Sequence, residues 1–450
     1  MPPILPYIHG HEEHCAPDRR HFPRGVLAVK TGKSIRVGFV WTSLGYGVYT
    51  LTQWLVLIIV ARLTEISTVG RLGLALAVCA PIYMLTNLGL RVGQATDAKR
   101  EFSFGTYLAL RTLSGICALL IACMVGTFIM LHGKPTVATV VTLVAITKLV
   151  DSQCDIFYGL FQQQERMDCT ARSLILRSIV GVLALTAAMW STGELAYGLV
   201  AQAIAWGIVH LSYDFAAARR LLPEGATLSI RPDWSRQQLL DLLRTSLPLG
   251  ISAGLISLRQ SMPRYVVQAL LGLDAVGLYT AAHYFLNAAT LFMNALGHTA
   301  SARLARLFAS GAARQFGRLL LKLAAVGLVA GLTLFFSVLI AGKPALFLLY
   351  GGEYRAAQVV LIALMAAAGV RFAATLIQFG VVASRRFGLH LMIQIALLAL
   401  TIGLCYALTQ IFGLAGAGYA VFGVSVFHLA IVGTAAFGMV SKLKRNQAIP

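Results

Sequence analysis

The sequence contains few charged residues, and acidic ones are the scarcest. Only 12% of its 450 residues are charged, and 17 are acidic against 37 basic, which gives a net charge of +20. A soluble domain of this length needs far more charge on its surface, which excludes a soluble enzyme or binding domain. Because the hydrophobic share is 58%, we expect the positive charge to meet anionic headgroups of membrane lipids rather than nucleic acid.

Cysteine is also sparse and shows no regular spacing. The seven cysteines are Cys15, Cys79, Cys117, Cys123, Cys154, Cys169 and Cys405. Most of them lie within or beside apolar segments, and none is paired at the spacing of a metal site. We therefore predict neither a disulfide framework nor a zinc site.

The first 34 residues lack the short apolar core of a cleaved signal peptide. They are polar and basic, so we expect residues 1–34 to form a disordered cytoplasmic tail that precedes an uncleaved signal anchor. Side chains of the metal-binding types cluster in this tail, but not at the H-E-x-x-H spacing of a zinc helix. The cluster consists of His9, His11, Glu12, Glu13, His14 and Cys15.

Long apolar segments fill the rest of the chain. A helix of about 20 apolar residues is long enough to cross a bilayer. Twelve such segments are predicted, at 36–60, 72–93, 106–131, 137–162, 173–192, 195–217, 246–271, 276–298, 319–341, 356–382, 387–411 and 414–440. The predicted fold is therefore an all-α polytopic membrane protein.

The basic residues predict the orientation of these helices, because lysine and arginine in short loops are retained on the cytoplasmic side. If the N-terminus is cytoplasmic, the outer loops carry only Arg62, Arg71, Lys134, Lys343 and Arg355. Four further basic residues are counted inside the spans, namely Lys148, Arg259, Arg264 and Arg371. We therefore predict a protein of the bacterial cytoplasmic (inner) membrane with both termini in the cytoplasm.

A polar stretch at 218–244 divides the spans into two sets of six. We expect an N-terminal bundle at 35–217, a cytoplasmic linker at 218–244, a C-terminal bundle at 245–440 and a cytoplasmic tail at 441–450. A shift of 207 positions superposes Gln53 on Gln260, Val69-Gly70 on Val276-Gly277, and Asn87 on Asn294. Two halves with an even number of spans form a parallel repeat, which places a substrate in a central cavity between two six-helix bundles. A chance alignment of apolar sequence is the alternative.

Polar side chains at helical spacing predict which faces line that cavity. The eighth predicted span carries them on one stripe, formed by His283, Asn287, Thr290, Asn294 and His298. The second predicted span offers a corresponding face with Tyr83, Asn87 and Arg91. We expect both faces to point to the interior.

Basic residues deep in the second half suggest an electropositive cavity. Arg259 and Arg264 flank Pro263, and Arg371 shares a helix face with polar residues. A charge inside a span is costly and usually faces a cavity or a partner. Converging arginines would suit a phosphate, which arginine binds bidentately. The alternative is that each arginine is paired with an acidic residue.

Acidic residues in the first half are candidates for ion coupling. Lys148, Asp151 and Asp155 share a face of the fourth predicted span, with Lys148 one turn from Asp151. A buried Lys148–Asp151 ion pair that only joins helices is the alternative. It would leave Asp155 as the less satisfied carboxylate, able to exchange H⁺ or Na⁺.

Several short motifs resemble those of one family in the same order. They are Val92-Gly93-Gln94-Ala95-Thr96-Asp97, Glu101-Phe102-Ser103-Phe104-Gly105, Gln164-Glu165-Arg166-Met167-Asp168, Ser261-Met262-Pro263-Arg264-Tyr265, Gly277-Leu278-Tyr279 and Tyr350-Gly351-Gly352-Glu353-Tyr354. The chain resembles the bacterial polysaccharide flippases of the multidrug, oligosaccharidyl-lipid and polysaccharide exporter superfamily. The resemblance implies transfer of an undecaprenyl-pyrophosphate-linked oligosaccharide across the membrane for O-antigen, capsule or exopolysaccharide assembly.

The resemblance also directs the expected roles of the site residues. Arg259, Arg264 and Arg371 would contact pyrophosphate or acidic sugar. The remaining substrate-binding candidates are Asn87, Arg91, His283, Asn287 and Asn294. Asp151, Asp155 and Lys148 would serve H⁺ or Na⁺ coupling, with no cofactor. The polysaccharide polymerase and the priming glycosyltransferase of the pathway are the expected protein partners.

Two other functions remain as alternatives. A multidrug or small-metabolite antiporter of the same superfamily would be expected to have a more acidic cavity. A polytopic polymerase or ligase would need a large outer loop for its chemistry, whereas the longest one predicted, at 342–356, has about 15 residues. We therefore expect a transporter rather than an enzyme.

Overall fold

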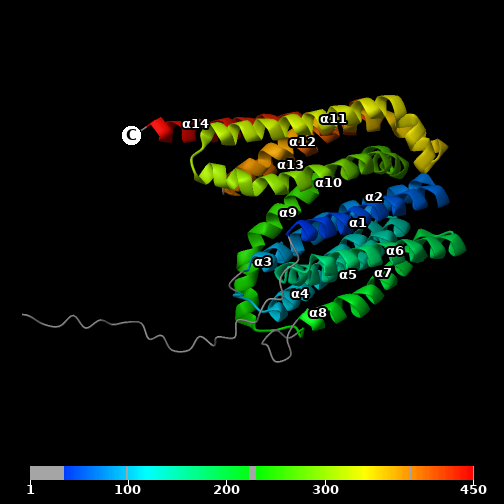
Figure 1. Cartoon of the computed structure of the whole chain (residues 1–450). Helices are drawn as coiled ribbons and strands as arrows, with labels where there is room; N and C mark the ends of the chain where they lie inside the picture. Colours follow the sequence, from blue (N-terminus) through cyan, green and yellow to red (C-terminus); the bar gives the residue numbers. More distant parts are fainter. Residues whose placement is uncertain (1–34, 98–99, 222–229, 385–386, 449–450) are drawn as a thin grey trace, which may run out of the picture.

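The computed structural model describes residues 35–97, 100–221, 230–384 and 387–448. Within these ranges the chain forms helices and turns, with no strand. The expectation for the tail at 1–34 and its metal-type cluster lies outside the described residues. Figure 1 shows two lobes of roughly parallel helices, the first built from α1–α8 and the second from α10–α14, with α9 running between them.

The first lobe begins at Ile35 and ends at Leu221. Its helices are α1 (Ile35–Leu63), α2 (Ile66–Thr86), α3 (Leu90–Thr96), α4 (Phe104–Leu131), α5 (Pro135–Gln163), α6 (Met167–Thr192), α7 (Leu195–Val209), the π-helix η1 (His210–Asp214) and α8 (Phe215–Leu221). The remaining helices are α9 (Arg236–Leu271), α10 (Leu273–Ala309), α11 (Ala313–Tyr350), the 3₁₀-helix η2 (Gly352–Ala357), α12 (Gln358–Ala383), α13 (Phe387–Phe412) and α14 (Leu414–Ala448).

Length and composition confirm the predicted class of an all-α polytopic membrane protein. Among the described residues, 11 helical segments are long and apolar enough to cross a membrane. The eighth predicted span, at 276–298, corresponds to α10, which has 37 residues but is not one of those segments. Its polar stripe accounts for this, since His283, Asn287 and Asn294 replace apolar residues along one face.

The two lobes meet closely at one end of the molecule, which we call the distal face. The helix α1 ends there at Leu63, and α11 ends there at Tyr350. A Cβ added to Gly70 of α2 would lie 2.0 Å from the carbonyl oxygen of Leu273, and one added to Gly277 of α10 would lie 2.4 Å from that of Ile66. Small residues allow such close helix contacts in membranes. The two contacts are reciprocal, because a shift of 207 positions takes Gly70 to Gly277 and Ile66 to Leu273. The halves of the predicted repeat are therefore related by an axis that passes between α2 and α10.

Further contacts close the distal face. Trp54 of α1 donates a hydrogen bond of 2.6 Å to the hydroxyl of Tyr350. Arg62 donates to the carbonyl oxygens of Phe347 and Leu349, at 3.1 and 3.0 Å, in the last turn of α11. A cation near the C-terminal end of a helix is favourable because the carbonyls there lack partners within the helix.

The lobes diverge toward the opposite end, which we call the terminal face because α1 begins and α14 ends there (Figure 1). The long helix α9 bridges them in this region. A Cβ added to its Gly250 would lie 2.5 Å from the carbonyl oxygen of Leu85 in α2. The closed distal face and the divergent terminal face give the molecule a V shape.

Several helix ends differ from the predicted ones. The second predicted span is broken after Thr86, where Leu88 and Gly89 adopt positive φ angles of 54° and 62°. The segment predicted as the longest outer loop is largely helical, because α11 continues to Tyr350. The helix α9 begins at Arg236, ten residues before the predicted span, because its first three turns are amphipathic and escape a search for apolar segments.

Candidate functional site

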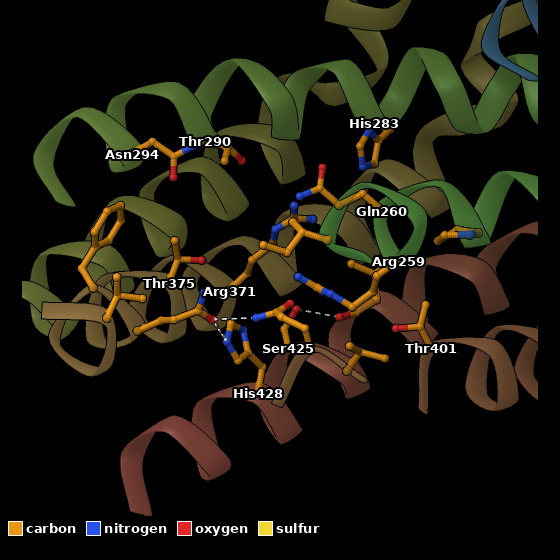
Figure 2. A pocket seen from close by; sticks show the side chains of 18 of the residues that line it. Arg259, Gln260, His283, Thr290, Asn294, Arg371, Thr375, Thr401, Ser425 and His428 are labelled. Atoms are coloured by element: carbon orange, nitrogen blue, oxygen red, sulfur yellow. Dashed lines mark hydrogen bonds between the residues drawn. The ribbon is translucent and has the colours of Figure 1, made fainter. Parts of the chain in front are cut away.

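A polar cavity lies inside the second lobe. It has a volume of about 260 Å³ and is enclosed by α9, α10, α12, α13 and α14. Figure 2 shows Arg259 of α9 and Arg371 of α12 extending into it, with Thr290 and Asn294 of α10 on one wall and Ser425 and His428 of α14 on the other. These two arginines therefore share a cavity that lies within the second lobe rather than between the lobes.

Helix geometry explains how these side chains converge. On α12, Arg371, Thr375 and Gln378 lie four and three residues apart, so they share one face. On α10, the same spacing brings Thr290 and Asn294 to the cavity. Both sets lie on the face of their helix that points into the cavity.

The charge of the cavity is positive and uncompensated. None of the described residues that line it is acidic. From Arg236 to Ala448 the sequence contains only three acidic residues, Asp241, Asp274 and Glu353, and among the described residues none of them forms a salt bridge with Arg259 or Arg371. The two arginines lie close enough to repel one another. Arg259 Nε is buried without a hydrogen-bond partner in the described structure.

Neutral amide and imidazole groups form the rest of the polar wall. The side-chain oxygen of Gln378 accepts a hydrogen bond of 3.3 Å from Gln394 and a second one from His428 Nε2 (Figure 2). These groups supply donors and acceptors without adding negative charge. An anion entering the cavity would meet two guanidinium groups and would lose its hydration to this polar wall.

Arg264 is buried but occupies a different position from Arg259. It does not line the cavity and donates a hydrogen bond of 3.2 Å to His283 Nδ1. Because arginine can only donate, this nitrogen must accept, and the remaining ring nitrogen of His283 carries the proton. His283 lines the cavity and stacks on Tyr279, with 5.6 Å between the ring centroids. Arg264 therefore holds His283 in the neutral form in which its Nε2–H is the hydrogen-bond donor.

The predicted stripe on α10 divides between three environments. His283, Thr290 and Asn294 line the cavity of the second lobe. Asn287 instead lines a pocket of about 250 Å³ between the lobes, together with Tyr49, Gln53, Trp54 and Lys148 among others. The ring of His298 packs against Phe379. Only part of the stripe therefore faces the cationic cavity.

The buried charges of the first lobe are paired, in contrast with those of the second. Asp155 forms salt bridges of 3.2 Å with both Arg91 and Arg111. Asp151 is bonded to Lys148 at 3.2 Å and to Arg177 at 2.8 Å. The expectation that Asp155 is the less satisfied carboxylate is therefore wrong, because each carboxylate lies between two cations.

The sequence analysis does not identify Arg111 and Arg177 as buried, paired residues. Both lie near the start of predicted spans and were counted with the cytoplasmic residues, yet their side chains are 0% and 2% exposed. The available signal was the presence of each arginine several residues inside an apolar segment. Arg177 also lies over the rings of Trp206 and Tyr49, at 4.6 and 5.4 Å, where cation–π attraction adds to the ion pair.

The other candidates of the second predicted span lie in the first lobe. Asn87 accepts a hydrogen bond of 2.6 Å from Ser152. Arg91 donates to Tyr46, Asp155 and Gln162. Both residues are thus part of a network with α5 and do not reach the cavity of the second lobe.

Comparison with known proteins identifies the family and the fold. The profile of a family described as "Polysaccharide biosynthesis protein" matches residues 35–302. The chain is 24% identical over 370 residues to the capsular polysaccharide biosynthesis protein CapF of Staphylococcus aureus, covering 82% of this chain and 90% of that one.

Solved transporter structures share the two-lobe architecture. A MOP superfamily transporter from Pyrococcus furiosus, whose binding pocket of reversed polarity suggests a different function, superposes with a TM-score of 0.65 at 14% identity, covering 90% of this chain and 95% of that one. An inward-facing multidrug resistance MATE family transporter superposes with a TM-score of 0.64 at 12% identity over the same shares. At these identities the likeness concerns the fold.

The family profile covers well over half of the chain and agrees with the relative and with the transporter fold. The resemblance seen in the sequence motifs is thereby confirmed. The chain belongs to the polysaccharide biosynthesis protein family and is a multi-pass membrane protein with a MATE-like transporter fold.

Proposed function

We propose that the protein is a flippase for an oligosaccharide linked to undecaprenyl pyrophosphate. In this proposal it lies in the bacterial cytoplasmic membrane with both termini in the cytoplasm. It moves the head of the lipid-linked oligosaccharide from the inner to the outer leaflet for the assembly of surface polysaccharide. The protein acts as a transporter and makes or breaks no covalent bond.

The observation that supports this function best is the uncompensated positive charge of the cavity in the second lobe. Among the described residues of its wall, none offers Arg259 or Arg371 an acidic partner. An isolated buried cation is unfavourable until an anion pairs with it, and a guanidinium group binds two phosphate oxygens at once. The pyrophosphate or an acidic sugar of the substrate would supply that anion.

The size of the cavity limits what it can hold. Its volume of about 260 Å³ is slightly smaller than that of ordinary ligand pockets, which span roughly 300–1,000 Å³. We therefore place one anionic group in it and the remaining sugars between the lobes. The pocket there offers Tyr49, Trp54 and Asn287, which supply the aromatic faces and amides that sugars bind.

The V shape suggests how the head crosses. The lobes diverge at the terminal face and are closed at the distal face (Figure 1), so the proposed orientation makes this conformation open to the cytoplasm. Transport would proceed by rocking of the two repeats around the axis between α2 and α10. The lipid tail would remain in the bilayer beside the opening.

Ion coupling is a further part of the proposal. Asp155 and Asp151 have side chains that are 32% and 25% exposed, so either could exchange H⁺ or Na⁺ if its cations moved away. Lys148 borders the pocket between the lobes and is placed to link such a movement to lobe rocking. The polysaccharide polymerase and the priming glycosyltransferase are proposed as partners in the pathway.

A multidrug antiporter is the second candidate, because its fold is the same. An organic cation needs a carboxylate in the binding cavity. None of the described residues that line the cavity of the second lobe is a carboxylate, and Asp151 and Asp155 of the first lobe are each held by two cations. The charge distribution therefore favours an anionic substrate.

The test is a deletion of the gene in its own host, followed by mass spectrometry of undecaprenyl-linked oligosaccharides. The proposal predicts that complete single repeat units accumulate on the cytoplasmic leaflet while surface polysaccharide disappears. Complementation with Arg259→Gln/Arg371→Gln should fail, whereas Arg318→Gln, an exposed arginine on α11, should restore export. Normal polysaccharide together with altered resistance to toxic organic cations would instead support the antiporter.

A further inference from the structure

A second site of unusual composition lies in the first lobe, away from the cavity. Cys154 of α5 and His210 and Asp214 of η1 place their ligand atoms within 4.8 Å of one another. Their side chains are buried, with residue exposures of 0%, 8% and 0%. The spacing of the cysteines predicted no metal site, and the cluster forms only because the fold brings α5 against the end of α7.

The carboxylate of Asp214 is only half satisfied. Its Oδ2 lies 2.9 Å from His210 Nδ1. Its Oδ1 is buried and has no hydrogen-bond partner in the part of the chain that the structure describes. Buried polar atoms are almost always paired, so an unpaired carboxylate oxygen indicates a missing ligand.

The backbone is also specialised at this point. The chain from Leu195 to Leu221 is helical, but the five residues His210–Asp214 form a π-helix. Such turns are rare and frequently occur at functional sites. This one brings His210 and Asp214 to the same side, facing the sulfur of Cys154.

Aromatic rings and one cation surround the cluster, with the Arg177 guanidinium near the Cys154 thiol. The ring of His210 packs against Phe157 and Phe215, at centroid distances of 4.9 and 5.3 Å. These aromatic walls keep the imidazole in place. A metal ion in this position would take three ligands from the polar side chains, and a water molecule would complete a tetrahedral shell.

We propose that Cys154, His210 and Asp214 bind a divalent transition-metal ion, for which Zn²⁺ is the best match. Zinc takes sulfur, nitrogen and oxygen ligands in tetrahedral sites with bonds of about 2.0–2.3 Å, which place the ligand atoms roughly 3.3–3.8 Å apart. The observed limit of 4.8 Å requires only small side-chain shifts. Binding displaces the thiol proton and gives Asp214 the partner that it lacks.

The site would join α5 to the end of α7 and so brace the first lobe near the terminal face. It makes no use of the cavity of the second lobe and does not depend on the proposed transport function. The alternative structure of the cluster is a His210–Asp214 ion pair beside an inert thiol.

The test uses the full-length protein in detergent without a polyhistidine tag. In every sample His9, His11, His14 and Cys15 are replaced by alanine, so that the tail cannot bind metal. After chelator treatment the protein is titrated with Co²⁺ and, separately, with Zn²⁺. The proposal predicts equimolar binding, tetrahedral Co²⁺ absorption and a thiolate-to-cobalt charge-transfer band.

Variants assign the signal to the site. Cys154→Ala should abolish the charge-transfer band, and Asp214→Asn should weaken binding at least tenfold, whereas Cys79→Ala, another buried free cysteine, should leave both unchanged. If these variants fold poorly, the protein that carries only the tail substitutions still tests the proposal. A Co²⁺ titration of that protein without the charge-transfer band overturns it. Binding that survives Cys154→Ala overturns it as well.

Discussion

Neutralising Asp155 should destabilise the first lobe, because that carboxylate compensates two buried cations. It lies 3.2 Å from both Arg91 and Arg111. The Arg111 side chain is 0% exposed, so water cannot replace the lost partner. In Asp155→Asn the amide keeps the shape of the side chain but removes its charge, and both arginines lose their counter-ion.

The expected magnitude follows from the burial of the pair. Removing one member of a buried ion pair costs about 3–5 kcal/mol, because the other charge remains buried and unpaired. The Asp155 side chain is 32% exposed, which lets solvent screen part of the interaction, so we expect about 2–3 kcal/mol. Replacing Arg111 by methionine in the same variant removes the orphaned cation and should recover at least half of the loss.

Thermal inactivation of the purified protein in detergent is the appropriate assay, because polytopic proteins usually unfold irreversibly. The predicted order of half-lives is wild type, then Asp155→Asn/Arg111→Met, then Asp155→Asn. Asp241→Asn serves as the control. Asp241 and Arg244 form a loose, exposed pair at 3.9 Å, so this substitution should leave the half-life unchanged. If Asp155→Asn is as stable as wild type, or if the double variant is less stable than the single one, the reasoning is refuted.

Three further predictions concern helix contacts. Gly70→Leu should force the lobes apart at the distal face and abolish surface polysaccharide, whereas Gly47→Leu, where a Cβ would meet nothing within 4 Å, should not; export with Gly70→Leu would contradict the closed contact. Arg62→Gln should lower the apparent melting temperature by removing the donors to α11, and an unchanged value would show that these bonds are dispensable. Gly331→Leu should reduce the yield of folded protein, because a Cβ there would lie 2.0 Å from the Cα of Gly369; a normal size-exclusion profile would argue against that packing.

Much of the fold could be predicted because a bilayer imposes a simple rule on sequence. Every span must satisfy its backbone within a helix and present apolar side chains to lipid. The shift of 207 residues between Gly70 and Gly277 was also visible in the sequence, and the structure shows these two glycines in reciprocal contact. The polar stripe of α10 was visible for the same reason, since helical periodicity is local.

The pairing of charges could not be predicted in the same way. The sequence shows how far Arg111 and Arg177 lie from a helix end, but not which carboxylate each one meets across the lobe. Those contacts depend on how α4 and α6 pack against α5. Conversely, Arg259 and Arg371 looked like cavity residues because the second half of the chain offers almost no acids, and that shortage is a property of composition that the fold cannot alter.

The most direct measurement of the central claim is anion binding by the cavity of the second lobe. Purified protein in nanodiscs would be titrated with a short-chain prenyl pyrophosphate, with Arg259→Gln/Arg371→Gln as the test variant and Arg318→Gln as the control. The account predicts saturable binding that inorganic pyrophosphate displaces and that weakens more than tenfold in the double variant alone. Equal binding by all three proteins, or tight binding of a lipophilic organic cation in its place, would contradict it.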